Sequence, residues 1–400
     1  MLKFIENNSA QKHDAFVTNH KLCNLLQSAN WAKVKDNWKH SYTAVFDGDV
    51  MVAAALVLIK QLPLGFTMMY IPRGPVMDYD NQEIIEFYLQ ALKNWAKKKK
   101  CIFISFDPAL IVREFRLDET DTPYEKDVLN NIETLKKNGA IFKGFTESIQ
   151  DTIQPRFHMG VYCSDHWKED FPKSTMKSIR KAMNKQVEVT EIQVDQIDEF
   201  ARIMHLTEER KNVHLRDKQY FEKLKNTYQD DAHLFLAKVN PSKREKELKA
   251  KINELNERLK DDKLKEKGIR KLHEEIRKVE EEMASIQEVL ELSKDETVIA
   301  CGLMICYGNY AEMLYAGMDE NYRAFRSQYL IYLKQFEYAF DHGYQFVTMG
   351  GVEGSLKDGL SVFKSNFNPT VVEYVGEFDL PVKKTLYKAA KLAQKIRTGK

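Results

Sequence analysis

The sequence predicts a mixed α/β protein with two similar halves, the second interrupted by an antiparallel helical hairpin. Its 400 residues exceed what one hydrophobic core usually organises and suggest two or three domains. Apolar residues make up 43%, while only 17 Gly and 10 Pro occur, which favours packed cores over disorder. Strand-like and helix-like runs alternate on both sides of one highly charged segment, which places that segment inside the second half.

The first half is expected over residues 1–150. It contains strand-like runs at 41–46, 51–59 and 101–106 and a helical run at 82–99. The longest uninterrupted apolar run, 50–59, is about half the length that a membrane-spanning helix needs. The N-terminus has none of the parts of a signal peptide. We therefore expect a cytoplasmic protein.

The second half is expected over residues 151–241 together with 295–381. Strands are predicted on both sides of the interruption, at 151–153, 160–163, 187–191, 233–237, 297–306, 310–316, 346–349 and 371–378. Helices are predicted at 174–184, 197–210 and 323–342.

The interruption, residues 242–294, is expected to form a coiled-coil arm. Between 243 and 292 there is no Pro or aromatic residue, and the one Gly is Gly268. Apolar residues follow a heptad seam: Ile269, Leu272, Ile276, Val279, Met283, Ile286 and Leu290, echoed by Leu248, Ile252, Leu255 and Leu259. Asp261, Asp262 and Gly268 mark the turn between two antiparallel helices. Fourteen Lys/Arg balance fourteen Asp/Glu, so the arm is either a solvated ion-paired hairpin or an element that orients a partner.

Basic residues cluster at three places in a chain whose formal net charge is only +2. The final stretch, 382–400, has seven Lys/Arg and no acid, and its apolar residues have helical spacing, which predicts a basic amphipathic helix packed on the first half. Lys97 to Lys100 form the second cluster. The third is the acid-free stretch 173–185 with Lys173, Lys177, Arg180, Lys181 and Lys185. Each is either a solvated helix face or a contact for tRNA phosphates or an anionic membrane surface.

Common catalytic and ligand motifs are missing from this sequence. There is no phosphate-binding glycine loop, zincin motif or nucleophile elbow. The five cysteines form no C-x-x-C pair and the histidines are scattered, so we expect neither disulfides nor a metal. The glycines in 350–354 fit either a tight turn or a close approach to a ligand.

Four separated segments together carry a family resemblance. These are 26–35 (LQSANWAKVK), 70–75 (YIPRGP), 315–318 (YAGM) and 359–367 (GLSVFKSNF), the last followed by Glu377-Phe378-Asp379. The ordered set resembles the FemABX family of aminoacyl-tRNA-dependent peptidyltransferases, and is most similar to its MurM branch, which builds branched muropeptides. The resemblance implies tandem acetyltransferase-like (GNAT) domains facing a peptidoglycan-precursor site, with the arm in contact with tRNA. Aminoacyl-tRNA is then the co-substrate and no cofactor is needed.

The resemblance implies a reaction and roles for named residues. The chain would transfer alanine or serine to the lysine ε-amine of a lipid-linked peptidoglycan precursor, at the inner face of the cell membrane. Lys364, in the Phe-Lys-x-x-Phe motif, matches the position that stabilises the developing oxyanion. By its chemistry alone, a lysine beside aromatic residues could equally extend to solvent.

The same resemblance implies further site residues. Lys35, Arg216 and Tyr220, the last two within the segment 215–220, match the positions that bind the precursor diphosphate, although an exposed Arg is often only solvated. Trp38 and Tyr315 are expected to line the same groove, and Phe363, next to Lys364, is expected to bind substrate as well. The attacking amine must lose a proton, and Asp107 before Pro108 is either its base or a turn-forming residue. Proton transfer through the tRNA terminus is a further alternative.

Two other functions are open from the sequence. An acyl-CoA-dependent N-acetyltransferase normally has a glycine-containing pyrophosphate turn at a helix start, and residues 323–329 contain no glycine. A non-catalytic tRNA- or membrane-binding adaptor would not need Lys364, Lys35, Arg216 and Tyr220, which are all present.

Overall fold

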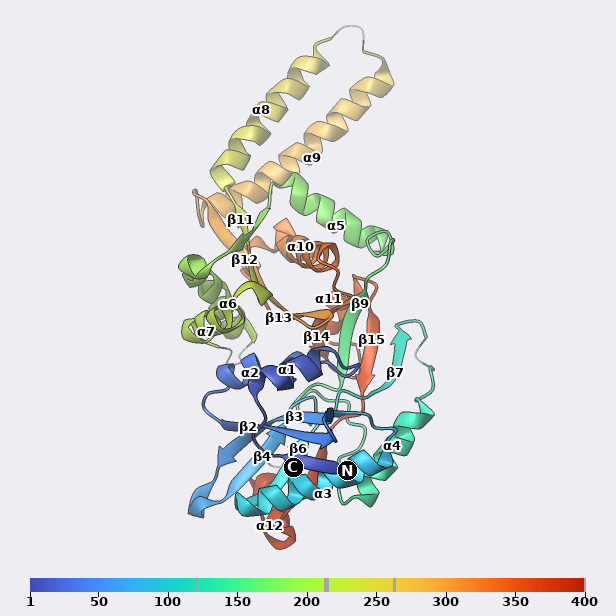
Figure 1. Ribbon diagram of the computed structural model, residues 1–400. Coiled ribbons are helices and arrows are strands. Elements are labelled where there is room, and N and C mark those ends of the chain that lie inside the picture. Colours follow the sequence, from blue (N-terminus) through green and yellow to red (C-terminus); the bar gives the residue numbers. More distant parts are fainter. Residues whose placement is uncertain (120, 212–215, 262–263, 399–400) are drawn as a thin grey trace.

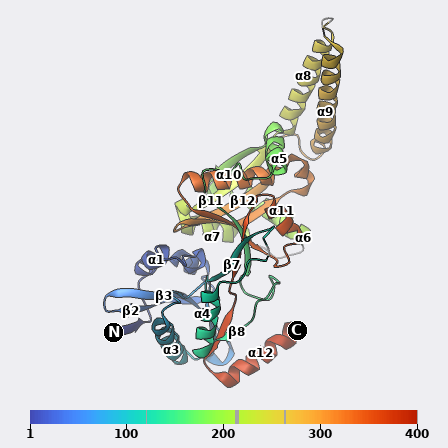
Figure 2. The same ribbon diagram turned by 90° about the vertical axis from the view of Figure 1, so that its right-hand side faces the viewer.

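The computed structural model describes residues 1–119, 121–211, 216–261 and 264–398. Two β-sheets, each flanked by helices, lie one above the other, and a long helical hairpin projects from the upper half (Figure 1). The view from the side in Figure 2 shows the same elongated arrangement. The predicted mixed α/β fold with an inserted antiparallel hairpin is confirmed.

The first sheet has the strand order β1-β2-β3-β4-β6-β16-β8, with β5 paired to β3. Its strands are β1 (Leu2–Ile5), β2 (Lys39–Asp47), β3 (Val50–Gln61), β4 (Thr67–Ile71), β5 (Val76–Met77), β6 (Cys101–Phe106), β8 (Ile141–Phe142) and β16 (Phe378–Pro381). Its helices are α1 (Ala10–Thr18), α2 (Ala29–Val34), α3 (Gln82–Lys98), α4 (Lys126–Lys137) and α12 (Lys384–Thr398).

The second sheet has the order β10-β11-β12-β13-β14-β9-β15-β7. Its strands are β7 (Ile111–Arg116), β9 (Phe157–Tyr162), β10 (Glu188–Ile192), β11 (Ala232–Val239), β12 (Thr297–Tyr307), β13 (Tyr310–Met318), β14 (Phe346–Val352) and β15 (Thr370–Tyr374). Its helices are α5 (Lys173–Asn184), α6 (Ile197–Lys211), α7 (Lys218–Tyr228), α10 (Ser327–Asp341) and α11 (Gly359–Ser365), with a short 3-10 turn, η5 (Glu320–Phe325), before α10.

The two halves repeat one topology. In each, an edge strand (β1 or β10) is followed by two helices, a three-stranded antiparallel meander, and a long helix that leads to a parallel strand; in the second half, β9 and α5 precede this unit. The parallel pairs are β4 with β6 and β13 with β14. In the first half the strands β2 and β3 are joined by a tight turn at Gly48, which has φ 58°. The arm occupies the equivalent connection, between β11 and β12, so it replaces a turn rather than a core element.

The arm consists of α8 (Pro241–Leu259) and α9 (Glu266–Leu290). Its base joins the second-half core through Leu248, Ile286 and Val289. Its outer part has a separate cluster around Leu255, Leu272 and Ile276, as the heptad seam predicts. Surface Lys/Arg and Glu pair along both helices. The predicted turn residue Asp262 lies outside the described residues, as does Leu215 at the start of the segment 215–220.

The sheets exchange strands across the expected domain boundaries. β7, from the range 1–150, pairs with β15 at the edge of the second sheet. β16, from the range 295–381, lies between β6 and β8 in the first sheet. The two halves are therefore interlocked by their own chain.

Two predicted strands were wrong. Residues 151–153 form a bend, in which the Thr152 hydroxyl donates to the Gln154 carbonyl over 2.6 Å. The run 371–378 is divided between β15 and β16, because Gly376 takes the left-handed φ of 97° and turns the chain into the other sheet. No helix in the described part of the chain is long and apolar enough to cross a membrane.

Candidate functional site

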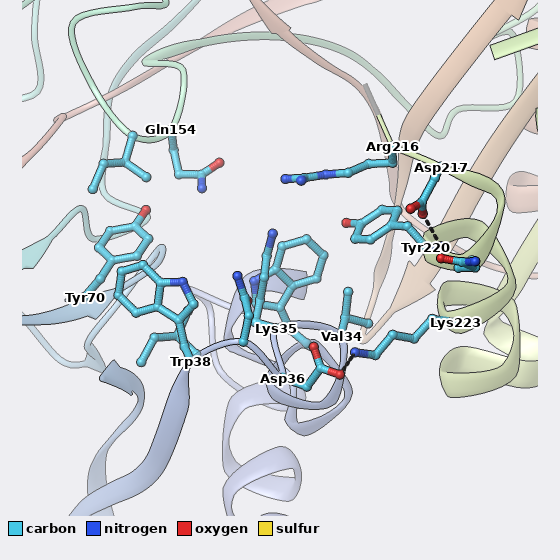
Figure 3. A pocket seen from close by; sticks show the side chains of 15 residues that line it. Val34, Lys35, Asp36, Trp38, Tyr70, Gln154, Arg216, Asp217, Tyr220 and Lys223 are labelled. Atoms are coloured by element: carbon cyan, nitrogen blue, oxygen red, sulfur yellow. Dashed lines mark hydrogen bonds and ion pairs between the residues drawn. The ribbon is translucent and has the colours of Figure 1, made fainter. Parts of the chain in front are cut away.

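A cleft of about 430 Å³ opens where α2 of the first half meets α7 of the second. Its walls come from both halves (Figure 3): Trp31, Val34, Lys35, Asp36, Asn37, Trp38, Leu58, Tyr70, Ile153, Gln154, Arg216, Asp217, Gln219, Tyr220 and Lys223. Four of the predicted substrate-binding residues, Lys35, Trp38, Arg216 and Tyr220, meet here. They lie as much as 185 positions apart in the sequence.

The C-terminal end of α2 places the first cation. The Ser28 hydroxyl caps this helix by accepting from the Trp31 amide over 3.0 Å. Lys35 follows the last turn, and its ammonium lies 4.7 Å from the centre of the buried Trp31 ring. The apolar ring therefore holds the lysine at the cleft without neutralising it.

The N-terminal end of α7 places the second cation. The Asp217 carboxylate caps the helix by accepting from the Tyr220 amide over 2.9 Å. The Arg216 guanidinium lies 5.0 Å from the centre of the Tyr220 ring. In Figure 3 the side chains of Arg216 and Lys35 point from opposite walls into the same space.

The cleft has two cations that the protein itself does not pair. Neither Lys35 nor Arg216 forms an ion pair within the described residues, whereas the nearby Asp36 is paired with Lys223. Burial and, secondarily, the charge of Arg216 lower the pKa of Lys35 to about 8. Two repelling cations, of which Lys35 is partly buried and Arg216 exposed, are an arrangement that an anionic ligand would stabilise, and a diphosphate offers both charges at short separation.

Tyrosines support the second-half wall. The Tyr315 hydroxyl donates to the Tyr220 hydroxyl over 3.4 Å, and the two rings meet edge to face. Tyr315 lies behind Tyr220 and does not itself line the cleft. Its contact with Phe221 anchors it to α7, so Tyr315 orients Tyr220.

Asp107 is placed behind the cleft. It is buried, its Oδ2 lies 3.6 Å from Arg73 Nη1, and its Oδ1 accepts from the Arg73 amide over 3.3 Å. Burial raises its pKa to about 7, against the opposing effect of Arg73. Tyr70, which lines the cleft, has a pKa raised by burial and by the charge of Asp107. Asp107 therefore lies close enough to Tyr70 for its charge to act on a hydroxyl at the cleft.

Arg73 also connects the two halves. Its Nη2 donates to the Pro155 carbonyl over 2.6 Å and lies 3.1 Å from His158 Nε2. Its guanidinium stacks 4.0 Å from the Tyr374 ring centre. The first-half segment 70–75 is thus joined to β9 and β15 of the second half.

Lys364 and Phe363 lie away from the cleft. Lys364 is only 3% exposed, and its ammonium donates to the Gly351 carbonyl over 2.9 Å, so this lysine does not extend to solvent. Gly350 lies beside it in the left-handed conformation, with φ 82°; an added Cβ would lie 3.8 Å from Lys364 Nζ, an ordinary contact, so the backbone conformation and not the space favours glycine here. The charge of Lys364 helps to lower the pKa of His158, after burial and Arg73.

Phe363 borders a second cavity of about 500 Å³, which is lined by Arg210, Ala316, Gly317, Met318, Glu320, Gln328, Tyr332, Asp358, Gly359, Leu360 and Phe363. Its ring packs edge to face against Tyr332. The start of α10 at this cavity has no glycine, and Arg326 itself takes the left-handed φ of 58°.

The carboxylates of the segment 377–379 serve as anchors. Glu377 accepts from the Ile153 amide over 3.0 Å and so holds the segment that carries Gln154 into the cleft. Asp379 accepts from the Tyr387 hydroxyl over 3.0 Å and pairs with Lys391 over 2.7 Å, which fixes α12 to the first sheet.

The sequence analysis missed Tyr70 and Gln154 as cleft residues. Tyr70 begins one of the quoted segments, so its signal was present. Gln154 directly follows the run 151–153, which was expected to be a strand, and no motif marks it. Within the described residues, no group of three or more His, Cys, Asp or Glu side chains could hold a metal ion.

Comparisons with known proteins cover nearly the whole chain. The FemAB family matches residues 9–395. The lipid II:glycine glycyltransferase of Staphylococcus epidermidis is 30% identical, with 95% of this chain and 93% of that protein aligned. The enzyme of the same name from Staphylococcus saprophyticus is also 30% identical, over 95% and 94%. A crystal structure of FemX superposes with a TM-score of 0.78 and 27% identity, over 97% of this chain and 99% of that one.

Proposed function

The chain belongs to the FemAB family of tRNA-dependent aminoacyltransferases, and on this basis we propose that it adds an amino acid to lipid II, building the interpeptide bridge. The acceptor is the ε-amine of the stem-peptide lysine. The observation that carries the proposal is the pair Lys35 and Arg216, contributed by different halves and directed into one cleft, with no ion pair to either among the described residues.

The precursor diphosphate is proposed to bind between these two cations. Lys35 and Arg216 each donate to phosphate oxygens, and the Tyr220 hydroxyl supplies a third donor. Trp38 and Tyr70 form the aromatic wall opposite α7 (Figure 3). Binding would place negative charge between the two cations and offset the repulsion by Arg216 that, after burial, lowers the pKa of Lys35.

The proposed reaction is aminolysis of an ester. The lysine nitrogen forms a bond to the aminoacyl carbonyl carbon, the carbon–oxygen ester bond breaks, and the terminal hydroxyl of the tRNA leaves. Lys364 is the proposed stabiliser of the oxyanion, since its buried ammonium lies in a low-dielectric interior where a fixed charge acts strongly. Asp107 is the proposed acceptor of the amine proton by way of Tyr70, because a carboxyl with a pKa of about 7 can exchange protons at neutral pH.

The donor amino acid is proposed to be small. The sequence analysis favours alanine or serine, whereas the names of the similar staphylococcal enzymes specify glycine. The likeness to the MurM branch is likewise a prediction. The assay with differently charged tRNAs, described below, tests both the donor and this branch. We place the aminoacyl ester at the second cavity, beside Phe363 and Tyr332.

The membrane contact is assigned to α12. Tyr387 and Lys391 face the first sheet, so Leu386 and Leu392 are left 37% and 62% exposed beside the exposed Lys384 and Lys388. An apolar face flanked by lysines suits the surface of an anionic membrane, where lipid II would be presented at the inner face.

The double change Lys384→Gln and Lys388→Gln tests this contact. It should weaken binding to anionic vesicles about fivefold per lysine. The same change at Lys136 and Lys137 of α4 is the control. Equal vesicle binding by both variants would remove α12 from the proposal.

The function itself is tested by incubating the protein with lipid II and tRNAs charged with glycine, alanine or serine. One mass increment on lipid II, absent when its lysine ε-amine is acetylated, is the expected result. Transfer from acetyl-CoA, or no transfer from any charged tRNA, would contradict the proposal.

A further inference from the structure

We infer that the exposed face of α5 is the surface that receives the phosphates of the tRNA stem, next to the cavity for its charged end. The inference rests on the proposed use of aminoacyl-tRNA and adds where the body of that tRNA binds. It concerns Lys173, Lys177, Arg180 and Lys181.

These four residues share one exposed face of α5. The opposite face, with Thr175, Ile179 and Ala182, is buried against the second-half core. Four cations thus face solvent along about 12 Å of helix. Lys185, the fifth basic residue of this stretch, is buried with its ammonium 5.0 Å from the Phe325 ring centre, so it is not part of the surface.

The charge of this face is not balanced by the protein. Within the described residues, none of the four cations forms an ion pair, and the stretch 173–185 contains no acid. Lys173 and Lys177, like Lys177 and Lys181, repel each other at helical spacing i,i+4. The arm shows the contrast, because its Lys249, Arg277 and Lys278 each pair with a glutamate one turn away. A partner with many negative charges would relieve the repulsion on α5.

The position of α5 favours tRNA as that partner. At its first turn the Thr175 hydroxyl donates to the Asn366 carbonyl, just beyond the helix that carries Phe363 and Lys364. At its other end, Lys185 contacts Phe325 of η5, the turn whose Glu320 lines the second cavity. Both views place α5 beside the base of the arm (Figures 1 and 2). A nucleic acid whose end occupies the second cavity would therefore pass over this helix.

A membrane fits this face less well. Met183 is the one large apolar side chain that α5 exposes, whereas membrane-surface helices combine cations with an apolar face. The leucine-bearing helix α12 lies at the opposite end of the molecule (Figure 1). One flat membrane could not lie against both helices and leave the arm free.

The test measures binding of uncharged tRNA between 50 and 200 mM salt. The variant has all four residues changed to Gln, and the matched control changes Lys97, Lys98, Lys99 and Lys100, four exposed lysines of the first half. Four lost phosphate contacts reduce the salt exponent by about 3 to 4, so over this range the wild-type affinity should fall on the order of 100-fold more than that of the variant. A variant with arginine at all four positions should bind like the wild type.

Transfer assays separate this inference from the proposed function. With aminoacyl-tRNA the α5 variant should show a raised KM, and with an aminoacylated CCA trinucleotide, too short to reach α5, its KM should be normal. An unchanged salt exponent, or loss of binding only to vesicles of phosphatidylglycerol and phosphatidylcholine, would overturn the inference. Wild-type protein that binds tRNA through α5 but transfers nothing would instead refute the proposed function alone.

Discussion

Changing Lys35 to Met tests the diphosphate site most directly. Methionine keeps the apolar stem that lies along the Trp31 ring but removes the ammonium. Lys33, two residues earlier in α2, is exposed and among the described residues is hydrogen-bonded only to Asn30, so it provides the control substitution Lys33→Met. Both variants should fold normally, so a difference between them reports on the cleft.

The size of the effect follows from the contact that is lost. A hydrogen bond between charged partners contributes about 1.5–3 kcal/mol, and each 1.4 kcal/mol is tenfold in Kd. Lys35→Met should therefore weaken binding of the precursor about 10- to 100-fold. Turnover at saturating precursor should change little, because Lys35 is assigned to the diphosphate, which takes no part in the bond changes.

A dependence on pH gives a second, independent signature. The pKa of Lys35 is lowered to about 8, so the free protein carries the ammonium below this pH and loses it above. Affinity for a diphosphate should therefore be highest below pH 8 and fall as the pH rises through it. Lys35→Met should abolish this fall. Arg216→Met should move it to higher pH, because the charge of Arg216 is one cause of the lowered pKa.

The assay is isothermal titration of a water-soluble diphosphate-containing precursor between pH 6.5 and 9.5. If Lys35→Met binds as tightly as Lys33→Met, or if the fall above pH 8 persists in Lys35→Met, the diphosphate does not bind at Lys35.

Three other predictions concern the chemistry and the arm. Lys364→Met should lower turnover on the order of 10²- to 10³-fold with little change in precursor Kd; a defect confined to Kd would move Lys364 to the binding group. The pKa of Asp107 is about 7 in the folded chain, against about 4 for an unfolded aspartate. The folded state therefore binds the proton more tightly, and the free energy of unfolding should fall by up to about 4 kcal/mol as the pH rises from about 4 to about 7. Urea unfolding should show this slope in the wild type and not in Asp107→Asn, and an Asp107→Asn enzyme with an unchanged pH profile of kcat/KM would exclude Asp107 as the base. Replacing residues 252–281 by a Gly/Ser linker should leave the second-half core intact, since Leu248, Ile286 and Val289 are kept; precursor binding should persist while KM for tRNA rises, and an unchanged KM would leave the outer arm without a role.

Local sequence patterns predicted the elements that depend on local interactions. The heptad seam of the arm identified both helices, because Leu272 and Ile276 are buried by a neighbour close in sequence. The α5 and α6 helices were likewise found from their spacing. The run 371–378 failed because periodicity cannot reveal that Gly376 redirects the chain from one sheet to the other.

The sequence predicted which residues belong to the candidate site but not how they are arranged in space. Lys35 and Arg216 were proposed as one pair from the family resemblance, and their shared cleft depends on packing between halves that no local pattern records. For Asp107 the sequence could not reveal its contact with Arg73 or its burial behind Tyr70, because those partners lie 34 and 37 positions away. The unpaired state of the α5 cations was visible as an acid-free stretch, but their common exposure required the fold.

The exchanged strand β16 has a consequence for how the protein folds during its synthesis. The first sheet is incomplete until residues 378–381 have been synthesised. Among the described strands β8 pairs only with β16, and β16 also pairs with one edge of β6. During synthesis the amino-terminal half must therefore persist with an open strand edge while almost the entire remainder of the fold is translated. Such an edge invites pairing with other chains. Long chains usually fold one domain at a time, beginning with the N-terminal domain. In this protein the first half cannot complete its sheet before β16 is made, so the two halves must reach their native structure together.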